Sequence, residues 1–121
     1  MDYKLSVNDV LATHTQLYEK ALRLVARKGE DYNRKQQSGG DTLFNLRVSR
    51  ILGVVETDEA SILTRMLDKI MRLISLTAPK EIQQPECNDE KVEDTVIDLI
   101  NYTVYLYAVH RKRLNQYNGI Q

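Results

Sequence analysis

The sequence predicts an all-α protein, and three observations predict it. Only 5 glycines and 2 prolines occur in 121 residues, too few chain breakers for many short strands. Apolar residues recur at three- and four-residue steps in four separate segments. Hydrophobic residues make up 42% and charged residues 28%, which is typical of a globular protein. We therefore expect one four-helix bundle domain over 1–121, with its core in 6–114 and a frayed end in 115–121.

The first predicted helix has a recognisable start and stop. Ser6 is followed three residues later by Asp9, the pattern of a hydroxyl cap and an acid that close the first turn. Val10, Leu17 and Ala21 then recur on one stripe. Gly29 offers a C-terminal stop, so the helix is expected to end at 27 or 28.

The remaining three helices are predicted from the same kinds of signal. A short second helix ends at Gly53, and a third begins at Thr57 or Asp58 and ends before Pro79. A loop over 78–90 precedes the fourth helix, which is expected from about residue 88 to residue 114.

The charge and cysteine content exclude some classes of protein. Lys plus Arg is 17 and Asp plus Glu is 17, and this balance argues against binding to duplex nucleic acid or an anionic membrane. The longest nearly uncharged stretch, 95–109, is too short to span a bilayer and contains Asp98. The single cysteine, Cys87, fits a reducing compartment. We expect a cytoplasmic protein, in the host cytoplasm if a phage encodes it.

The third predicted helix carries a charged stripe. Arg65, Asp68, Lys69 and Arg72 share one side, opposite its apolar residues. The plainer interpretation is a solvated face on which these charges pair with one another. The alternative is a surface that binds phosphate groups.

The fourth predicted helix carries an acidic stripe with apolar residues on both edges. Asp94 and Asp98 lie one turn apart, followed by Asn101 and Tyr105 on the same side. Like charges this close need a positive neighbour. A hard cation with oxygen ligands such as Mg²⁺ would supply it, and so would structural ion pairs with the cations of the third helix. Both interpretations stay open.

A third cluster, Lys28-Gly-Glu-Asp31-Tyr32, stands where the first helix is expected to end. A cation, acids and an aromatic ring at a helix end suit contact with a nucleotide, with charge for phosphate and a ring for a base. A C-terminal cap followed by a solvated loop explains the same residues.

Two strings in the chain carry a family resemblance. They are Arg65-Met-Leu-Asp68-Lys69-Ile-Met-Arg72-Leu and Glu93-Asp94-Thr-Val-Ile-Asp98-Leu-Ile-Asn101-Tyr102. With the Lys28 cluster, their order resembles the nucleotide modification associated domain 1 family, small proteins common in bacteriophages and their hosts. The resemblance covers about 21–109. It implies a fold similar to the all-α MazG-like nucleoside triphosphate pyrophosphohydrolases, which use Mg²⁺ held by helix carboxylates and assemble as homo-oligomers.

The resemblance yields a set of expected site residues. Catalytic and Mg²⁺-binding roles fall on Asp68, Asp94 and Asp98. Contacts with a nucleotide or modified nucleotide fall on Lys28, Asp31, Tyr32, Arg65, Lys69, Arg72, Asn101 and Tyr102.

The chain also departs from the MazG-like pattern. The Glu-Glu-x-x-Glu string is absent, and the third helix offers only Asp68 among three cations. This favours binding of phosphates over binding of several Mg²⁺ ions. Three functions follow as expectations: a Mg²⁺-dependent pyrophosphohydrolase-like protein, a non-catalytic binder that sequesters a nucleotide, including a cyclic signalling nucleotide, and a helical interaction protein.

Overall fold

The computed structural model describes residues 2–35, 44–79 and 85–117, without the side chains of 29–35 and 85–88. All its regular elements are helices, which confirms the predicted class. They are α1 (Val7–Lys35), α2 (Phe44–Ile51), α3 (Asp58–Thr77) and α4 (Pro85–Tyr117). No described helix is long and apolar enough to cross a membrane.

Local signals begin or end three of the helices where the sequence predicts. Ser6 Oγ accepts from Asp9 N at 3.1 Å and Ser6 N donates to Asp9 Oδ2 at 3.0 Å, so both groups of the predicted capping box are in use. Thr57 Oγ1 accepts from Ala60 N at 3.0 Å and caps α3. Gly53 has φ 79°, the left-handed conformation that lets the chain leave α2.

Two helices are longer than predicted. α1 continues through Gly29 to Lys35, because an isolated glycine weakens a helix by about 1 kcal/mol without ending it. α4 begins at Pro85, a residue whose fixed φ suits the first helical position, and ends at Tyr117. The expected loop over 78–90 and the expected frayed end from 115 are thus partly helical.

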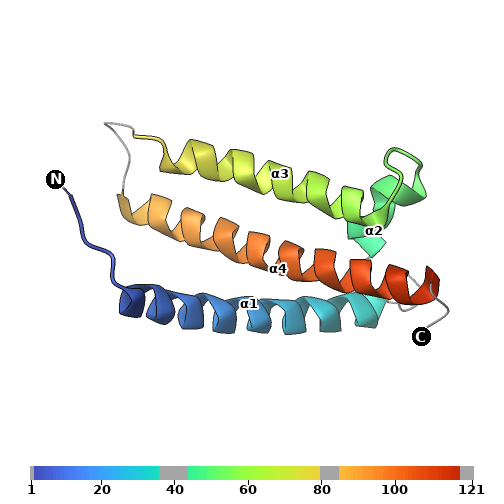
Figure 1. Ribbon diagram of the computed structural model, residues 1–121, viewed down its shortest axis with the longest axis horizontal. Coiled ribbons are helices and arrows are strands. Elements are labelled where there is room, and N and C mark those ends of the chain that lie inside the picture. Colours follow the sequence, from blue (N-terminus) through green and yellow to red (C-terminus); the bar gives the residue numbers. More distant parts are fainter. Residues whose placement is uncertain (1, 36–43, 80–84, 118–121) are drawn as a thin grey trace.

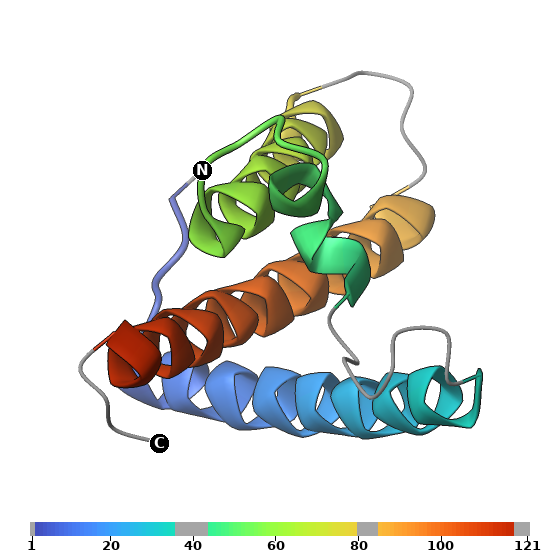
Figure 2. The same cartoon turned by 90° about the vertical axis from the view of Figure 1, so that its right-hand side faces the viewer.

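α4 lies in the middle of the molecule, with α1 on one side and α3 on the other (Figures 1 and 2). Within the described part of the chain, α1 packs only on α4, and α2 packs only on α3. A single chain therefore forms an open layer of helices. Its buried apolar side chains, among those described, are Ala21, Ile62 and Ile97.

Polar contacts help to fix two of the helix pairs. Asn101 Nδ2 donates to Ala21 O at 3.2 Å and joins α4 to α1. Arg47 and Arg50 of α2 bind the two carboxylate oxygens of Asp58 at 3.0 and 2.8 Å and hold α2 against the start of α3.

Candidate functional site

The charged stripe of α3 and a ring from α4 line one hollow. Its lining residues are Arg65, Asp68, Lys69 and Arg72 of α3 and Tyr102 of α4, and its volume is about 310 Å³. Lys69 and Tyr102 are half-buried at its inner side, whereas the other three side chains are exposed. We call this the α3 hollow. It brings together five of the residues that the sequence predicts for a nucleotide site.

Asp98 reaches this stripe through an ion pair. Lys69 Nζ lies 3.1 Å from Asp98 Oδ2, and both side chains keep about a quarter of their surface exposed, 29% and 26%. The helices thereby juxtapose one predicted carboxylate and one predicted cation. For Asp98, this is the structural ion pair that the sequence leaves open as an alternative to a metal.

Asp94 and Asp98 line a second, larger hollow, between α4 and α1. Its volume is about 760 Å³, and α1 supplies its other wall through Lys20, Arg23 and Arg27. Glu93, also in this lining, pairs with Lys20 at 2.6 Å. Three acids thus face three bases in this α1–α4 groove, and its net charge is close to zero.

The three carboxylates expected to bind Mg²⁺ do not line one hollow. Asp68 lines the α3 hollow, whereas Asp94 and Asp98 line the α1–α4 groove. Among the described residues, no three or more His, Cys, Asp or Glu side chains group where they could hold a metal ion. Lysines pair with Glu93 and Asp98, so a hard cation in the α1–α4 groove would compete with them for these carboxylate oxygens.

The other predicted site residues have different surroundings. Asn101 is 7% exposed and its amide donates to the α1 backbone, so this nitrogen joins helices. Lys28 is exposed on α1 and lines neither hollow. The side chains of Asp31 and Tyr32 lie outside the described residues.

Sequence reasoning did not identify the basic side of α1 as part of a site. Lys20, Arg23 and Arg27 recur at three- and four-residue steps, so their spacing places them on one side of the helix. That signal was available in the sequence. Their position opposite Asp94 and Asp98 depends on how α1 packs on α4, which the spacing does not contain.

A charged cluster where α3 meets the end of α4 was also not predicted. Arg113 Nε donates to Glu59 Oε2 at 2.8 Å, and His110 Nδ1 lies 3.0 Å from the same oxygen. The Arg113 hydrogen bonds lower the pKa of Glu59 to about 2, against the opposing effect of burial, and His110 adds to the lowering. This carboxylate is therefore ionised over the whole physiological pH range.

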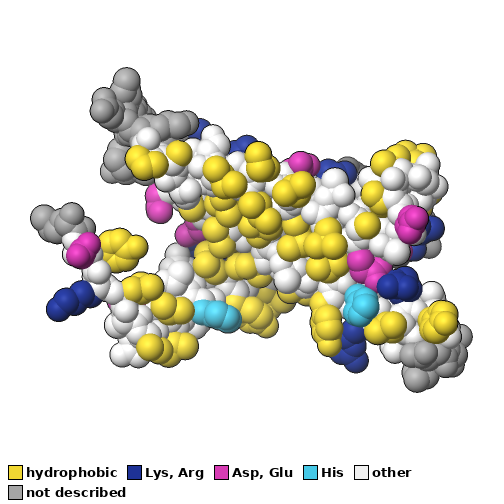
Figure 3. Space-filling view, turned by 45° about the horizontal axis from the view of Figure 1, so that its top comes forward, with side chains coloured by type: hydrophobic (Ala, Val, Ile, Leu, Met, Phe, Trp, Pro, Cys, Tyr) yellow, Lys and Arg dark blue, Asp and Glu magenta, His cyan; other side chains and the backbone are white. Residues whose placement is uncertain are grey.

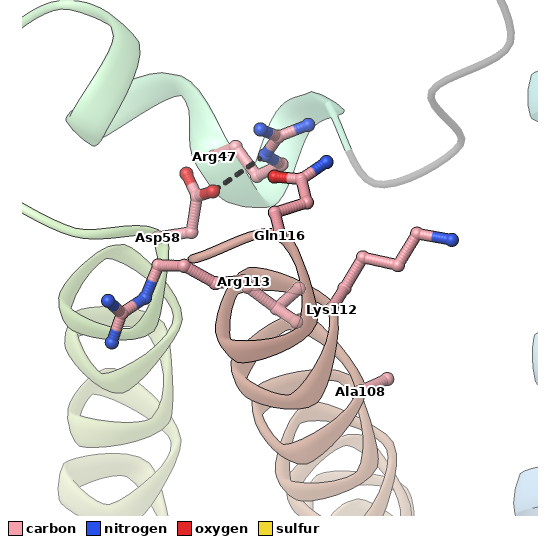
Figure 4. A pocket seen from close by; sticks show the side chains of 7 residues that line it. Arg47, Asp58, Ala108, Lys112, Arg113 and Gln116 are labelled. Atoms are coloured by element: carbon pink, nitrogen blue, oxygen red, sulfur yellow. Dashed lines mark hydrogen bonds and ion pairs between the residues drawn. The ribbon is translucent and has the colours of Figure 1, made fainter. Parts of the chain in front are cut away.

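A further hollow near that cluster has two arginines that are already engaged in ion pairs. Arg47, Asp58, Lys112, Arg113 and Gln116 line it, together with Ala108 and Val109. Figure 4 shows that Arg47 meets Asp58 across it, that the Arg113 guanidinium reaches toward α3, and that Lys112 points outward. It is a weaker anion site than the α3 hollow.

Comparison with known proteins leaves the chain without a match. No protein-family model, no curated protein and no solved structure matches it. The family resemblance stays an expectation based on the two sequence strings.

Proposed function

We propose that this protein binds a nucleotide through its phosphate groups at the α3 hollow, without needing a divalent metal. The observation that carries the proposal is the lining of that hollow, where three cations, Arg65, Lys69 and Arg72, accompany one acid, Asp68. Arginine and lysine donate charge-assisted hydrogen bonds to phosphate oxygens, and arginine can do so with two parallel bonds.

The balance of charges supports this choice over the α1–α4 groove. The groove is larger, but its three acids balance its three bases. The α3 hollow keeps a positive excess even with Lys69 paired to Asp98, because its two arginines face only Asp68. A polyphosphate with several negative charges is therefore attracted more strongly to the α3 hollow.

Tyr102 supplies the other half of nucleotide recognition. Its ring lines the α3 hollow and lies 6.4 Å, centroid to centroid, from the ring of Tyr105. An aromatic face beside a cationic stripe suits a base stacked next to its own phosphates. The MazG-like architecture expected from the resemblance remains part of the proposal, with Lys28, Asp31 and Tyr32 as further contacts.

The test is titration calorimetry with ATP, ADP and AMP in EDTA and again in Mg²⁺. We expect binding in EDTA that strengthens with phosphate number. The double variant Arg65→Gln/Arg72→Gln should weaken it at least about tenfold, because two charge-assisted donors are lost. The matched control is Lys91→Gln, an exposed cation of α4 that lines neither hollow. Unchanged affinity in the double variant, or no binding by any nucleotide, would contradict the proposal.

Mg²⁺-dependent pyrophosphate release is the second candidate. It is favoured by one observation, the shared position of Asp94 and Asp98 in the α1–α4 groove. Mass spectrometry of the nucleotide after incubation separates the two functions. A binder returns the nucleotide unchanged, whereas a hydrolase returns the monophosphate and pyrophosphate, and Asp98→Asn should then abolish the release.

A further inference from the structure

One face of the helical layer is apolar and uncovered. On α3, Leu63, Leu67, Ile70 and Ile74 recur at three- and four-residue steps, on the side of the helix away from Arg65 and Arg72. They are between 44% and 60% exposed. α3 thus has an apolar stripe on one side of its contact with α4 and a charged stripe on the other.

α1 and α4 extend this surface. Leu11, Tyr18 and Leu22 of α1 are 57%, 57% and 55% exposed, on the side of α1 away from Lys20 and Arg27. Tyr107 of α4 is 61% exposed and lines a shallow, almost wholly apolar hollow beside α3. Figure 3 shows apolar side chains gathered across the helices on this side, with charges toward its ends. These eight residues are called the apolar face.

The apolar face is too large for an isolated chain. Eight large side chains that are about half exposed present roughly 800 Å² of apolar surface, whereas the largest patch on a typical monomer is about 300–600 Å². By contrast, only three apolar side chains are buried among the described residues. A domain of this length normally buries most of its apolar surface, so the missing part of the core must come from outside the described helices.

The area and charge of this face fit a second copy of the same chain. About 800 Å² is what each partner of a stable interface buries. A formal net charge of zero means that two copies do not repel one another. The apolar stripe of α3 has the spacing with which helices interdigitate. Glu59 and Arg111 lie beside Tyr107, whereas the eight side chains of the face are uncharged, so they can pack against the same side chains of a second copy.

We propose that two copies of this chain associate through their apolar faces, so that two helical layers enclose one shared core. The α3 hollow and the α1–α4 groove then lie on the outer surfaces, because they are on the opposite side of each layer. The inference does not rest on the proposed nucleotide binding, since each copy keeps both hollows complete.

Light scattering coupled to size exclusion tests the association. The wild type should have the mass of two chains or a multiple of it. Leu67→Glu places a charge in the centre of the apolar face and should shift the mass toward one chain. Ser75→Glu is the matched control, an exposed α3 residue outside the apolar face that should keep the wild-type mass. A wild type that is helical by circular dichroism and has the mass of one chain would overturn the proposal and leave the face to a different partner.

Thermal unfolding keeps the proposal testable if Leu67→Glu fails to fold. Chains that share a core must unfold and dissociate together, so the wild-type melting temperature should rise over an about hundredfold increase in chain concentration. A melting temperature that stays constant over this range would refute a shared core. Nucleotide titrations measure a separate property, so the failure of one proposal leaves the other standing.

Discussion

Glu59 is the described carboxylate whose ionisation the fold changes most. Its side chain is 13% exposed, and Arg113, which is 48% exposed, binds it with two of its nitrogens. The fold therefore stabilises the ionised form, and the pKa falls to about 2. Because the folded pKa is below the ordinary value of 4.5, the unfolded chain binds the extra proton first as the pH falls.

Glu59→Gln should lower the free energy of unfolding at pH 7 by about 1 kcal/mol, since the half-exposed Arg113 is screened by solvent. The contribution of Glu59 is fully present above about pH 4.5 and is lost as the pH falls toward 2, so the two proteins should converge in that window. Urea unfolding of both proteins at pH 7 and pH 3, at one chain concentration, measures this. Glu56→Gln, an exposed acid, is the control, and an equal difference at both pH values would contradict the assignment.

At this scale, the sequence predicts which side chains share a helix surface but not what they face. Asp94 and Asp98 share one stripe of α4, as expected. Both line the groove opposite the bases of α1, and Asp98 also pairs with Lys69 of α3. Helical spacing contains no information on which neighbour packs against a stripe. The sequence alone therefore leaves the ion pair between Lys69 and Asp98 open, because this pair depends on how α3 packs on α4.

At the scale of elements, the helix boundaries predicted from strong local signals are correct, whereas those predicted from weaker signals are not. Thr57 and Gly53 act within a single turn, through a side-chain acceptor and a left-handed φ, and both were predicted. Gly29 was wrongly expected to end α1, because a glycine ends a helix only where the following chain cannot continue it. Pro85 starts α4 three residues before the expected position.

The short helix α2 depends on Asp58 for its position. Asp58 is 13% exposed and accepts from both Arg47 and Arg50, while Ser61 Oγ donates to Leu46 O nearby. Asp58→Asn removes the charge that both arginines bind, so we expect a loss of about 1–2 kcal/mol of stability. Hydrogen exchange should show reduced protection in α2 with little change in α1. Asp89→Asn, at an exposed acid, is the control, and unaltered protection of α2 would count against this role.

At the scale of the whole molecule, the layer has one charged side and one apolar side. The two proposals assign phosphate binding to the first and association to the second, and these forces respond oppositely to salt. Added NaCl screens charges, so nucleotide affinity should fall about tenfold between low and high salt. Association through the apolar face should persist or strengthen. Calorimetry and light scattering in the same buffers test this, and dissociation in high salt would indicate that charges hold the copies together.

Among the described helices, α1 packs only on α4, and this has a consequence for synthesis on the ribosome. α1 is translated first, but Asn101, whose amide holds it, is translated 80 residues after Ala21. α2 and α3 meet through residues 8 to 15 positions apart and can pair early. During translation, the side of α1 that packs on α4 therefore has no partner among the described residues until most of α4 has been made. A chaperone or a completed chain can bind that side of α1 in this interval.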